Sequence, residues 1–385
     1  MKLLIAGGGT GGHLFPGVAL AEELTTSNAQ NRVLFVGTAR GIEVRELPRA
    51  GFALELIDVT GLKGKGAFGL ITGLLRLPRA LLQSLAIVRR FRPDVVLATG
   101  GYVSVPPVIA AGLLRRPVLI HEQTVQVGLA NRIAARFATR IALTFEGAAS
   151  DLPPSLRAKT FVTGNPVRAA IFGGDRARAI ARFGFDPEDD VLPTVYVTGG
   201  ALGAQSINRA VESALMDLLT VCRIIHQCGK QDGDRMAGVR ASLLPEQQQR
   251  YHVVPFVGAE IADIFALADL VVGRSGAGTV TEVAAVGRPA LFIPLVPTGG
   301  DEQTRNAGRS VEAGAASLLP SRDLDGPRLL SAIRALLSDP LRLQVMGAAA
   351  LTLATPNAAH ELAAAVLELA EQVIRPTSGT INGKL

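Results

Sequence analysis

Short apolar runs, many of which end in glycine, alternate with stretches of helical pattern along the whole chain. The first half contains KLLIAG, RVLFVG, DVVLATG, PVLIHE and RIALTF, and the second half contains TVYVTGG, RIIHQCG, YHVVPFV, DLVVGRSG and PALFIPL. This alternation predicts βα units and parallel sheets, and open sheets of this kind bind ligands where their strands end. At 385 residues, the chain is long enough for two such domains.

Two glycine-rich turns, one in each half of the chain, have similar sequence patterns. IAGGGTGGH near residue 10 and VTGGALGAQSIN near residue 200 both have the order of a strand, a turn and a helix start. We therefore expect two doubly wound, Rossmann-like α/β domains that face each other across a cleft. The predicted boundaries are 1–163 and 164–355, with a turn at TGNPVR between them, a helix over 356–375 that could cross back to the first domain, and a disordered tail over 376–385.

Composition narrows the class of protein. A hydrophobic content of 48% excludes disorder, and Cys222 and Cys228 lack metal-ligand spacing, so we expect reduced thiols in a cytoplasmic protein. The N-terminus has one lysine and a short apolar run, which favours a first strand over a signal peptide. The uncharged run 95–114 contains Gly-Gly and Pro-Pro pairs, so we interpret it as a buried strand, a turn and a helix start.

The charge is unevenly distributed. Residues 1–163 hold 19 Lys and Arg against 10 Asp and Glu, whereas the remainder holds 20 against 23, which gives +9 and −3. Residues 59–93 carry seven basic side chains and no acidic one, with leucines between them. Such a segment fits either an anionic membrane surface or a core helix with a solvated basic face. Nucleic acid is a poorer partner, because aromatic side chains are few and no binding module is recognisable.

The turn GGGTGGH, residues 7–13, has the form of a phosphate-binding loop at a helix start. It meets the G-x-G-x-x-G spacing, but the second strand ends in Gly37 and Thr38 without the acidic residue of a dinucleotide site. It also lacks the Lys of a P-loop, since His13 stands there. His13 is a candidate general base, or else a capping or packing residue.

Further polar groups follow other strands. His121 and Glu122 end one strand, and we expect Asn131 and Arg168 to face the cleft. In GRSGAGTVTEV a helix is predicted to begin near Ala277, where backbone amides would bind a diphosphate and Glu282 would accept hydrogen bonds from sugar hydroxyls. The alternative is a structural role for the glycines and for this glutamate.

Two further polar runs contain candidate binding residues. Asp301, Glu302 and Gln303 follow a buried strand and suit a sugar ring, or else begin a helix. Asp232 and Asp234 lie in GKQDGDR, which we interpret as a solvated loop, with metal binding as a weaker alternative.

Six ordered motifs resemble one family of enzymes. They are GGGTGGHLFPGVALAEEL, ATGGYVSVPPVIAA, HEQTVQVGLANR, TGNPVR, GGALGAQSIN and RSGAGTVTEVAAVGRPALFIPL, and they match the MurG family of bacterial UDP-N-acetylglucosamine transferases, which convert lipid I to lipid II. The resemblance implies a GT-B fold whose first domain takes the lipid-linked acceptor and whose second takes UDP-GlcNAc, without metal or cofactor. It also implies a peripheral protein on the cytoplasmic face of the bacterial inner membrane, which supports the membrane interpretation of residues 59–93, with cell-wall or division proteins as further partners.

Carried over by motif, the resemblance assigns roles to individual residues. Thr10, Gly11 and Gly12 face a diphosphate, Arg168 helps bind the nucleotide donor, the backbone of Val257 meets uracil, and Gln303 contacts GlcNAc. The residues that hold the diphosphate and the sugar are Ala277, Gly278, Thr279, Val280, Thr281 and Glu282. Further binding positions are Thr124, Asn131 and Ala201. The chain departs from the family at Thr124, usually Asn, at Ala201, usually Ser, and at Glu302, commonly His.

The expected reaction transfers GlcNAc to the C4 hydroxyl of the muramyl sugar with inversion, and His13 is the first candidate for the base. One alternative is another UDP-sugar enzyme of the same fold, such as a glycolipid transferase or a UDP-GlcNAc 2-epimerase. A second alternative is a catalytically idle membrane scaffold.

Overall fold

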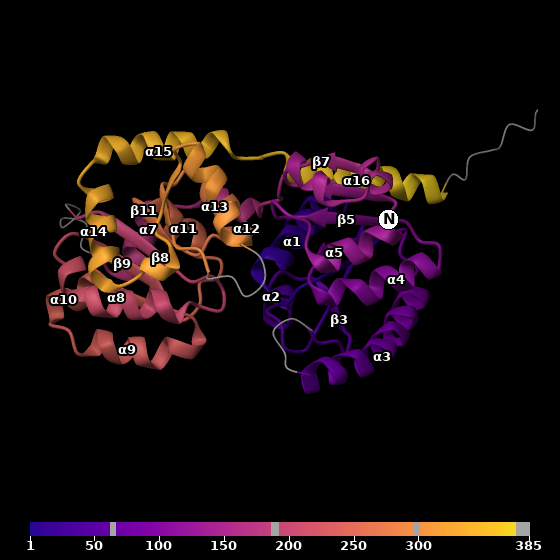
Figure 1. Ribbon diagram of the computed structural model, residues 1–385, viewed down its shortest axis with the longest axis horizontal. Helices are drawn as coiled ribbons and strands as arrows, with labels where there is room; N and C mark the ends of the chain where they lie inside the picture. Colours follow the sequence, from indigo (N-terminus) through magenta and orange to yellow (C-terminus); the bar gives the residue numbers. More distant parts are fainter. Residues whose placement is uncertain (62–66, 186–191, 296–300, 375–385) are drawn as a thin grey trace, which may run out of the picture. The chain divides into compact units, whose positions relative to one another are not determined.

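The computed structural model describes residues 1–61, 67–185, 192–295 and 301–374, without the side chains of 67–75 and 373–374 (Figure 1). The chain forms two compact units. The first comprises Met1–Pro166 and the segment that begins at Asn357, and the second comprises Val167–Pro356. The tail expected over 376–385 lies outside the described residues.

The first unit contains a seven-stranded sheet in the order β3-β2-β1-β4-β5-β6-β7, and every pairing is parallel. Its strands are β1 (Lys2–Gly7), β2 (Arg32–Gly37), β3 (Ala53–Leu56), β4 (Val95–Gly100), β5 (Val118–Glu122), β6 (Arg140–Leu143) and β7 (Thr160–Val162). Its helices are α1 (Gly11–Ser27), α2 (Glu43–Arg49), α3 (Ala67–Phe91), α4 (Val105–Leu113), α5 (Leu129–Ala134), α6 (Pro154–Arg157) and α16 (Ala358–Ile374). Short 3₁₀ helices cover Tyr102–Ser104, Ala135–Phe137 and Glu146–Asp151.

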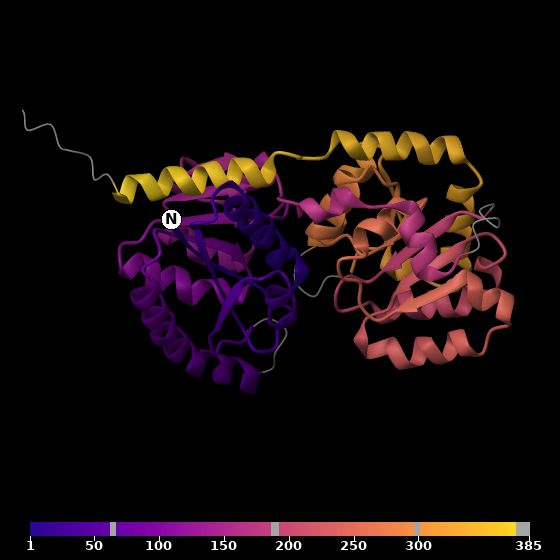
Figure 2. The same ribbon diagram turned by 180° about the vertical axis from the view of Figure 1, so that it is seen from behind.

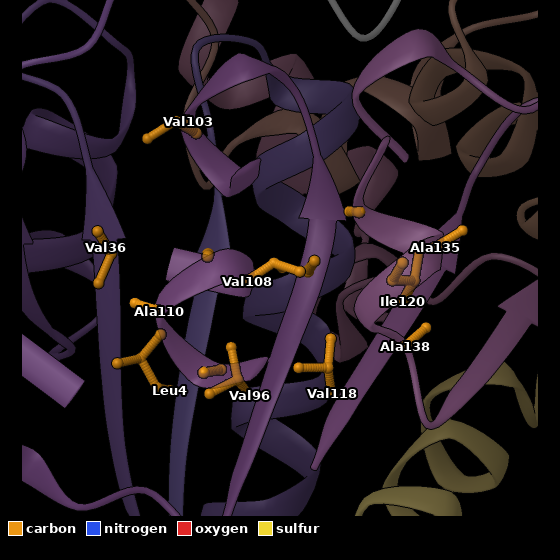
Figure 3. Close-up of a cluster of buried hydrophobic side chains, with 14 of the residues drawn as sticks. Leu4, Val36, Val96, Val103, Val108, Ala110, Val118, Ile120, Ala135 and Ala138 are labelled. Atoms are coloured by element: carbon orange, nitrogen blue, oxygen red, sulfur yellow. The ribbon is translucent and has the colours of Figure 1, made fainter. Parts of the chain in front are cut away.

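Apolar side chains cover both faces of this sheet. Figure 3 shows Leu4, Val96 and Val118 from three strands beside Val108 and Ala110 of α4, all buried in one cluster. Neighbouring positions on β1 are buried as well, because side chains alternate between the faces of a strand. A strand covered on both faces has to be apolar at successive positions, which explains the short unbroken runs in the sequence.

Helix α16 belongs to the first unit and packs along α1 (Figure 2). Leu362 and Val366 are buried. An ion pair between Arg140 and Glu368 and a hydrogen bond between His360 and Glu23 join this helix to the rest of the unit.

The second unit contains a six-stranded parallel sheet in the order β10-β9-β8-β11-β12-β13. Its strands are β8 (Thr194–Thr198), β9 (Arg223–Gln227), β10 (Tyr251–Val254), β11 (Leu270–Gly273), β12 (Ala290–Phe292) and β13 (Ala316–Leu318). Its helices are α7 (Arg176–Phe183), α8 (Gln205–Leu218), α9 (Gly233–Ala241), α10 (Pro245–Arg250), α11 (Ile261–Leu267), α12 (Ala277–Ala285), α13 (Glu302–Glu312), α14 (Gly326–Leu337) and α15 (Pro340–Thr352). Short 3₁₀ helices cover Ala169–Gly173, Lys230–Asp232 and Ser321–Asp323. The prediction of two doubly wound parallel α/β domains is confirmed.

The polar run GKQDGDR is not the solvated loop that we expected. Asp232 ends a 3₁₀ helix and is buried, accepting a hydrogen bond from Asn208 Nδ2 at 2.6 Å and pairing with Arg235 at 3.3 Å. These partners give the carboxylate a structural role. Across the described residues, no cluster of three or more His, Cys, Asp or Glu side chains has the arrangement of a metal site. Cys222 and Cys228 are free and buried, and burial raises the pKa of the Cys222 thiol to about 12.

The basic segment 59–93 forms α3 over most of its length. In the part whose side chains are described, Ala80, Ile87 and Val88 are buried in the core, while Arg79 and Arg89 are exposed. This half of the helix therefore has a core-facing apolar stripe and a solvated basic face. Its lysines, Lys63 and Lys65, lie outside the described residues. Among the helices of the described chain, none combines the length and the apolar character that crossing a bilayer requires.

Candidate active site

In the first unit, the turn between β1 and α1 is clamped by a buried carboxylate. Glu43 Oε2 accepts a hydrogen bond from the Gly9 amide at 2.9 Å, and Oε1 accepts from the Thr38 amide and hydroxyl at 2.8 and 3.1 Å. A Cβ on Gly8 would lie only 2.8 Å from the Glu43 carboxyl carbon, so this position requires glycine. One amide of the turn is thus already bound to the protein's own anion.

The remaining amides of the turn lie at the start of α1. Thr10 is the N-cap residue with an extended backbone, and its side chain makes no capping hydrogen bond to the described residues. Thr10 is exposed, and Gly11 and Gly12 are half-buried. Their N–H groups belong to the first turn of a 17-residue helix, where such groups have no intrahelical acceptor and favour an anion.

His13 follows directly and has a defined orientation. Its Nδ1 lies 3.1 Å from the Thr99 carbonyl oxygen and 3.2 Å from Gln123 Oε1. Both neighbours are acceptors, so Nδ1 carries the proton, and a neutral ring presents the lone pair of Nε2. The ring lies against Gly100 and Gly101, which have φ values of 96° and 76°, and a Cβ on Gly100 would lie 3.0 Å from Nδ1.

A buried chain of hydrogen bonds fixes Gln123. Its Nε2 donates to the His121 carbonyl at 2.9 Å and lies 3.0 Å from His121 Nδ1, which turns Oε1 toward His13. His121 Nε2 in turn donates to the Gly164 carbonyl at 2.9 Å. Burial lowers the pKa of His121 to about 4, so it is neutral at physiological pH. Gln123 was not a sequence-based candidate, although it stands inside the HEQT motif.

Glu122 is saturated by donors from its own loop. It accepts hydrogen bonds from the Thr124 amide at 3.1 Å, the Thr124 hydroxyl at 2.8 Å, the Gly128 amide at 2.9 Å and Asn131 Nδ2 at 2.9 Å. We expected Asn131 to face a cleft, but the structure buries both Asn131 and Thr124 in this network. Their side chains shape the loop, and the hydroxyl of Thr124 points at Glu122.

In the second unit, α12 begins where β11 ends. Gly276 is the N-cap residue with φ −64° and ψ 151°, and the first turn contains no acidic side chain. The amides of Ala277, Gly278 and Thr279 therefore form a second helix start that is suited to an anion. Thr281 is half-buried, and its hydroxyl donates to the Ala277 carbonyl at 2.8 Å.

Arg168 and Glu282 come together near this helix. Arg168 Nη2 lies 3.3 Å from Glu282 Oε1, and the two side chains are 17% and 18% exposed. Burial raises the pKa of Glu282, and the charge and hydrogen bond of Arg168 partly oppose this. The pair joins the segment that opens the second unit to α12.

Arg274 is a buried arginine that hydrogen-bonds to several segments, and it was not a sequence-based candidate. Its guanidinium donates to four oxygens on three segments at 2.8 to 2.9 Å, namely the Ile293 and Pro294 carbonyls and the Ser321 and Ser206 hydroxyls. Arg274 therefore ties the loop before α12 to the end of β12 and the start of α8. The only sequence feature that could have indicated this role is the position of Arg274 between a strand and a glycine-rich turn.

The other second-unit candidates occupy neighbouring loops. Gln303 Oε1 accepts from the Leu295 amide at 2.9 Å, and the Gln303 carbonyl accepts from the Ser275 hydroxyl at 2.7 Å. Within the described residues, the side-chain nitrogen of Gln303 has no hydrogen-bond partner. Ala201 is half-buried in the turn between β8 and α8, and the side chain of Val257 packs in the core.

The sequence matches two domain families in succession. Residues 3–143 match the glycosyltransferase family 28 N-terminal domain, and residues 194–362 match the glycosyltransferase family 28 C-terminal domain. Together with two doubly wound domains and their glycine-rich helix starts, this defines a glycosyltransferase of the GT-B fold.

Relatives that match over nearly the whole chain identify the family more closely. The chain is 42% identical over 365 residues to a UDP-N-acetylglucosamine–N-acetylmuramyl-(pentapeptide) pyrophosphoryl-undecaprenol N-acetylglucosamine transferase of Syntrophus aciditrophicus, which covers 94% of this chain and 97% of the relative. It also resembles the crystal structure of Acinetobacter baumannii MurG, with a TM-score of 0.69 and 28% identity over 95% of this chain and 99% of that one. The chain belongs to the MurG family of N-acetylglucosamine transferases.

A third likeness concerns the fold alone. UDP-GlcNAc 2-epimerase from Neisseria meningitidis, bound to UDP-GlcNAc, superposes with a TM-score of 0.66 at 16% identity and covers 96% of this chain and 100% of that one. Sequence identity therefore separates this chain from the epimerase, although the fold does not.

Proposed function

We propose that this protein transfers N-acetylglucosamine from UDP-GlcNAc to the lipid-linked N-acetylmuramyl-pentapeptide acceptor, which converts lipid I to lipid II in peptidoglycan synthesis. The observation that carries the proposal is the 42% identity to a transferase of that name over nearly the full length of both chains. The two uncapped helix starts, one in each unit, give each substrate phosphate a chemically suitable position.

In the proposed reaction, the C4 hydroxyl of the muramyl sugar attacks the anomeric carbon of GlcNAc. A carbon–oxygen bond forms on one face as the bond to the UDP phosphate breaks on the other, which inverts the anomeric centre. His13 Nε2 takes the hydroxyl proton, because the proton on Nδ1 is fixed by Thr99 and Gln123. UDP leaves with the bonding electron pair.

The donor is assigned to the second unit. The amides at the start of α12 and the guanidinium of Arg168 would stabilise the charge that develops on the leaving UDP. Ala277 to Glu282 would hold the diphosphate and the sugar, Gln303 would donate its amide to GlcNAc, and the backbone at Val257 and Ala201 would complete the site. The lipid-linked diphosphate is assigned to Thr10, Gly11 and Gly12, beside the loop that Thr124 and Asn131 shape.

Peripheral association with the anionic cytoplasmic face of the inner membrane through residues 59–93 is part of the proposal. Beside the exposed Arg79 and Arg89, Leu82 is 68% exposed on the same helix, which combines charge with an apolar side chain. Cell-wall or division proteins are proposed as further partners on family membership. Co-sedimentation of Leu82→Gln and Arg89→Glu with anionic vesicles should fall relative to the unaltered protein, and binding equal to that of the unaltered protein would argue against this surface.

A transfer assay tests the function directly. Purified full-length protein, given labelled UDP-GlcNAc and a lipid I analogue, should form a labelled lipid product. Binding of UDP-GlcNAc without transfer would instead indicate a catalytically idle scaffold. Release of N-acetylmannosamine from UDP-GlcNAc without an acceptor would indicate an epimerase.

A further inference from the structure

A cavity of about 320 Å³ lies in the first unit, apart from the helix starts described above. It is bounded by the loops after β2 and β3 and by one side of α3. Its polar lining consists mainly of Arg40, Asp58, Arg76, Arg79, Gln83 and Tyr102. This volume falls at the lower end of the range for small-molecule sites.

The lining carries an excess of positive charge. Asp58 pairs with Arg76 at 3.4 Å and with Arg79 at 3.8 Å, so one carboxylate is shared by two guanidinium groups. Arg40 adds a third guanidinium, which has no ion-pair partner in the described part of the chain. Gln83 Oε1 accepts from the Asp58 amide at 2.8 Å, which fixes the position of this strand end. Three arginines and one aspartate favour an anionic ligand, and guanidinium groups bind carboxylates in a bidentate manner.

The cavity adjoins the turn that carries His13. Tyr102 forms one wall, and a Cβ on Gly9 would lie 3.9 Å from its ring. A Cβ on Gly101, next to Tyr102, would lie 3.4 Å from the ring of His13. His13 therefore lies near Tyr102, which forms one wall of this cavity.

We propose that the cavity binds the peptide of the acceptor through a peptide carboxylate; this inference rests on the proposed function. The relatives' names give the acceptor a pentapeptide on its muramyl sugar. In muramic acid the peptide is attached through the lactyl ether at C3, next to the C4 hydroxyl that His13 would deprotonate. The peptide therefore starts beside His13, whose ring lies against Gly101 next to the cavity wall formed by Tyr102, and five extended residues reach up to about 17 Å from there.

The test compares two acceptors that differ only in the peptide. One is the lipid-linked N-acetylmuramyl-pentapeptide, and the other carries the same lipid and sugar without the peptide. We expect Arg76→Gln and Arg40→Gln each to raise KM about tenfold for the peptide acceptor and to leave KM for the peptide-free acceptor unchanged. Arg49→Gln is the matched control, because Arg49 is an exposed arginine of the same unit that pairs with Glu46, outside both the cavity and residues 59–93.

Two outcomes would overturn the inference. An equal rise of KM for both acceptors would assign the arginines to the lipid diphosphate or to the membrane, and no change for either would leave them without a substrate role. If neither the unaltered protein nor any variant transfers GlcNAc, calorimetry with soluble N-acetylmuramyl-pentapeptide tests directly whether the cavity binds the peptide. Binding to the unaltered protein that is lost in Arg76→Gln supports the cavity, and its absence from both overturns it.

Discussion

The position of a single proton decides whether His13 can act as a base. Thr99 and Gln123 both accept from Nδ1, so the neutral ring leaves Nε2 as an acceptor. We predict that His13→Ala lowers kcat by about 10² to 10⁴-fold, the usual contribution of general base catalysis. UDP affinity, measured by calorimetry, should stay within about twofold, because the residues that we propose for the donor lie in the second unit. Near-normal turnover would remove His13 from this role.

Gln123 acts on His13 by orienting it. Gln123→Met keeps the length of the side chain but removes both the acceptor for Nδ1 and the donor to His121. We predict a decrease of about tenfold in kcat, an unchanged KM for UDP-GlcNAc and a shifted pH–rate profile, because the ring loses one of the two acceptors that hold the proton on Nδ1 and orient it. Gln126→Met, three residues along the same loop, is the control and should leave the profile unchanged. A profile that does not move in Gln123→Met would leave the residue a purely structural role.

At the scale of elements, Glu43 connects α2 to the turn before α1. Glu43→Gln keeps the shape of the side chain but places an NH₂ group among donors that now bind the carboxylate. We predict that the free energy of unfolding falls by about 1–3 kcal/mol, the cost of leaving a buried polar group unpaired. Urea denaturation measures this. Glu55→Gln, which disrupts only an exposed pair with Arg90, should cost less than about 1 kcal/mol.

The strands show what could be predicted from the sequence and what could not. All ten predicted strands are present, and β1 and β2 have the predicted bounds. The three strands that we missed, β3, β7 and β13, lie at sheet edges and are only three or four residues long. An edge strand is partly exposed, so it lacks the continuous apolar run that identifies a strand buried on both faces.

In the candidate site, too, some features could be predicted from the sequence and others could not. Glycine-rich helix starts are local patterns, so the turn at Thr10 and the start of α12 could be predicted. The clamp from Glu43 reaches Gly9 across 34 residues, and Gln123 reaches His13 across 110. Such pairings arise only when parallel strands bring their ends to one edge of a sheet, and no spacing along the chain reveals them.

At the scale of the whole molecule, each unit contains a buried neutral histidine. Burial lowers the pKa of His121 to about 4 and that of His226 to about 3, against about 6.5 when unfolded. Between pH 6.5 and 4, the unfolded chain therefore binds more protons. The free energy of unfolding should be unaffected by these groups above pH 6.5 and fall below it by up to about 1.4 kcal/mol per pH unit for each histidine.

Denaturation midpoints between pH 7 and pH 4.5 check this prediction. His226→Gln should lower stability at pH 7 and flatten the slope, because one titrating group is gone. His360→Gln removes an exposed histidine and should leave the slope as it is. An unchanged slope in His226→Gln would mean that the acid sensitivity comes from other groups.

The first unit is discontinuous in the sequence, since α16 follows all of Val167–Pro356. A ribosome must therefore translate the whole second unit before α16 can cover α1 with Leu362 and Val366. A nascent chain that stops within the second unit carries an uncovered apolar face on the first, the kind of surface that chaperones and proteases recognise. Packing of α16 onto the first unit therefore occurs only in a chain whose second unit has already been synthesised.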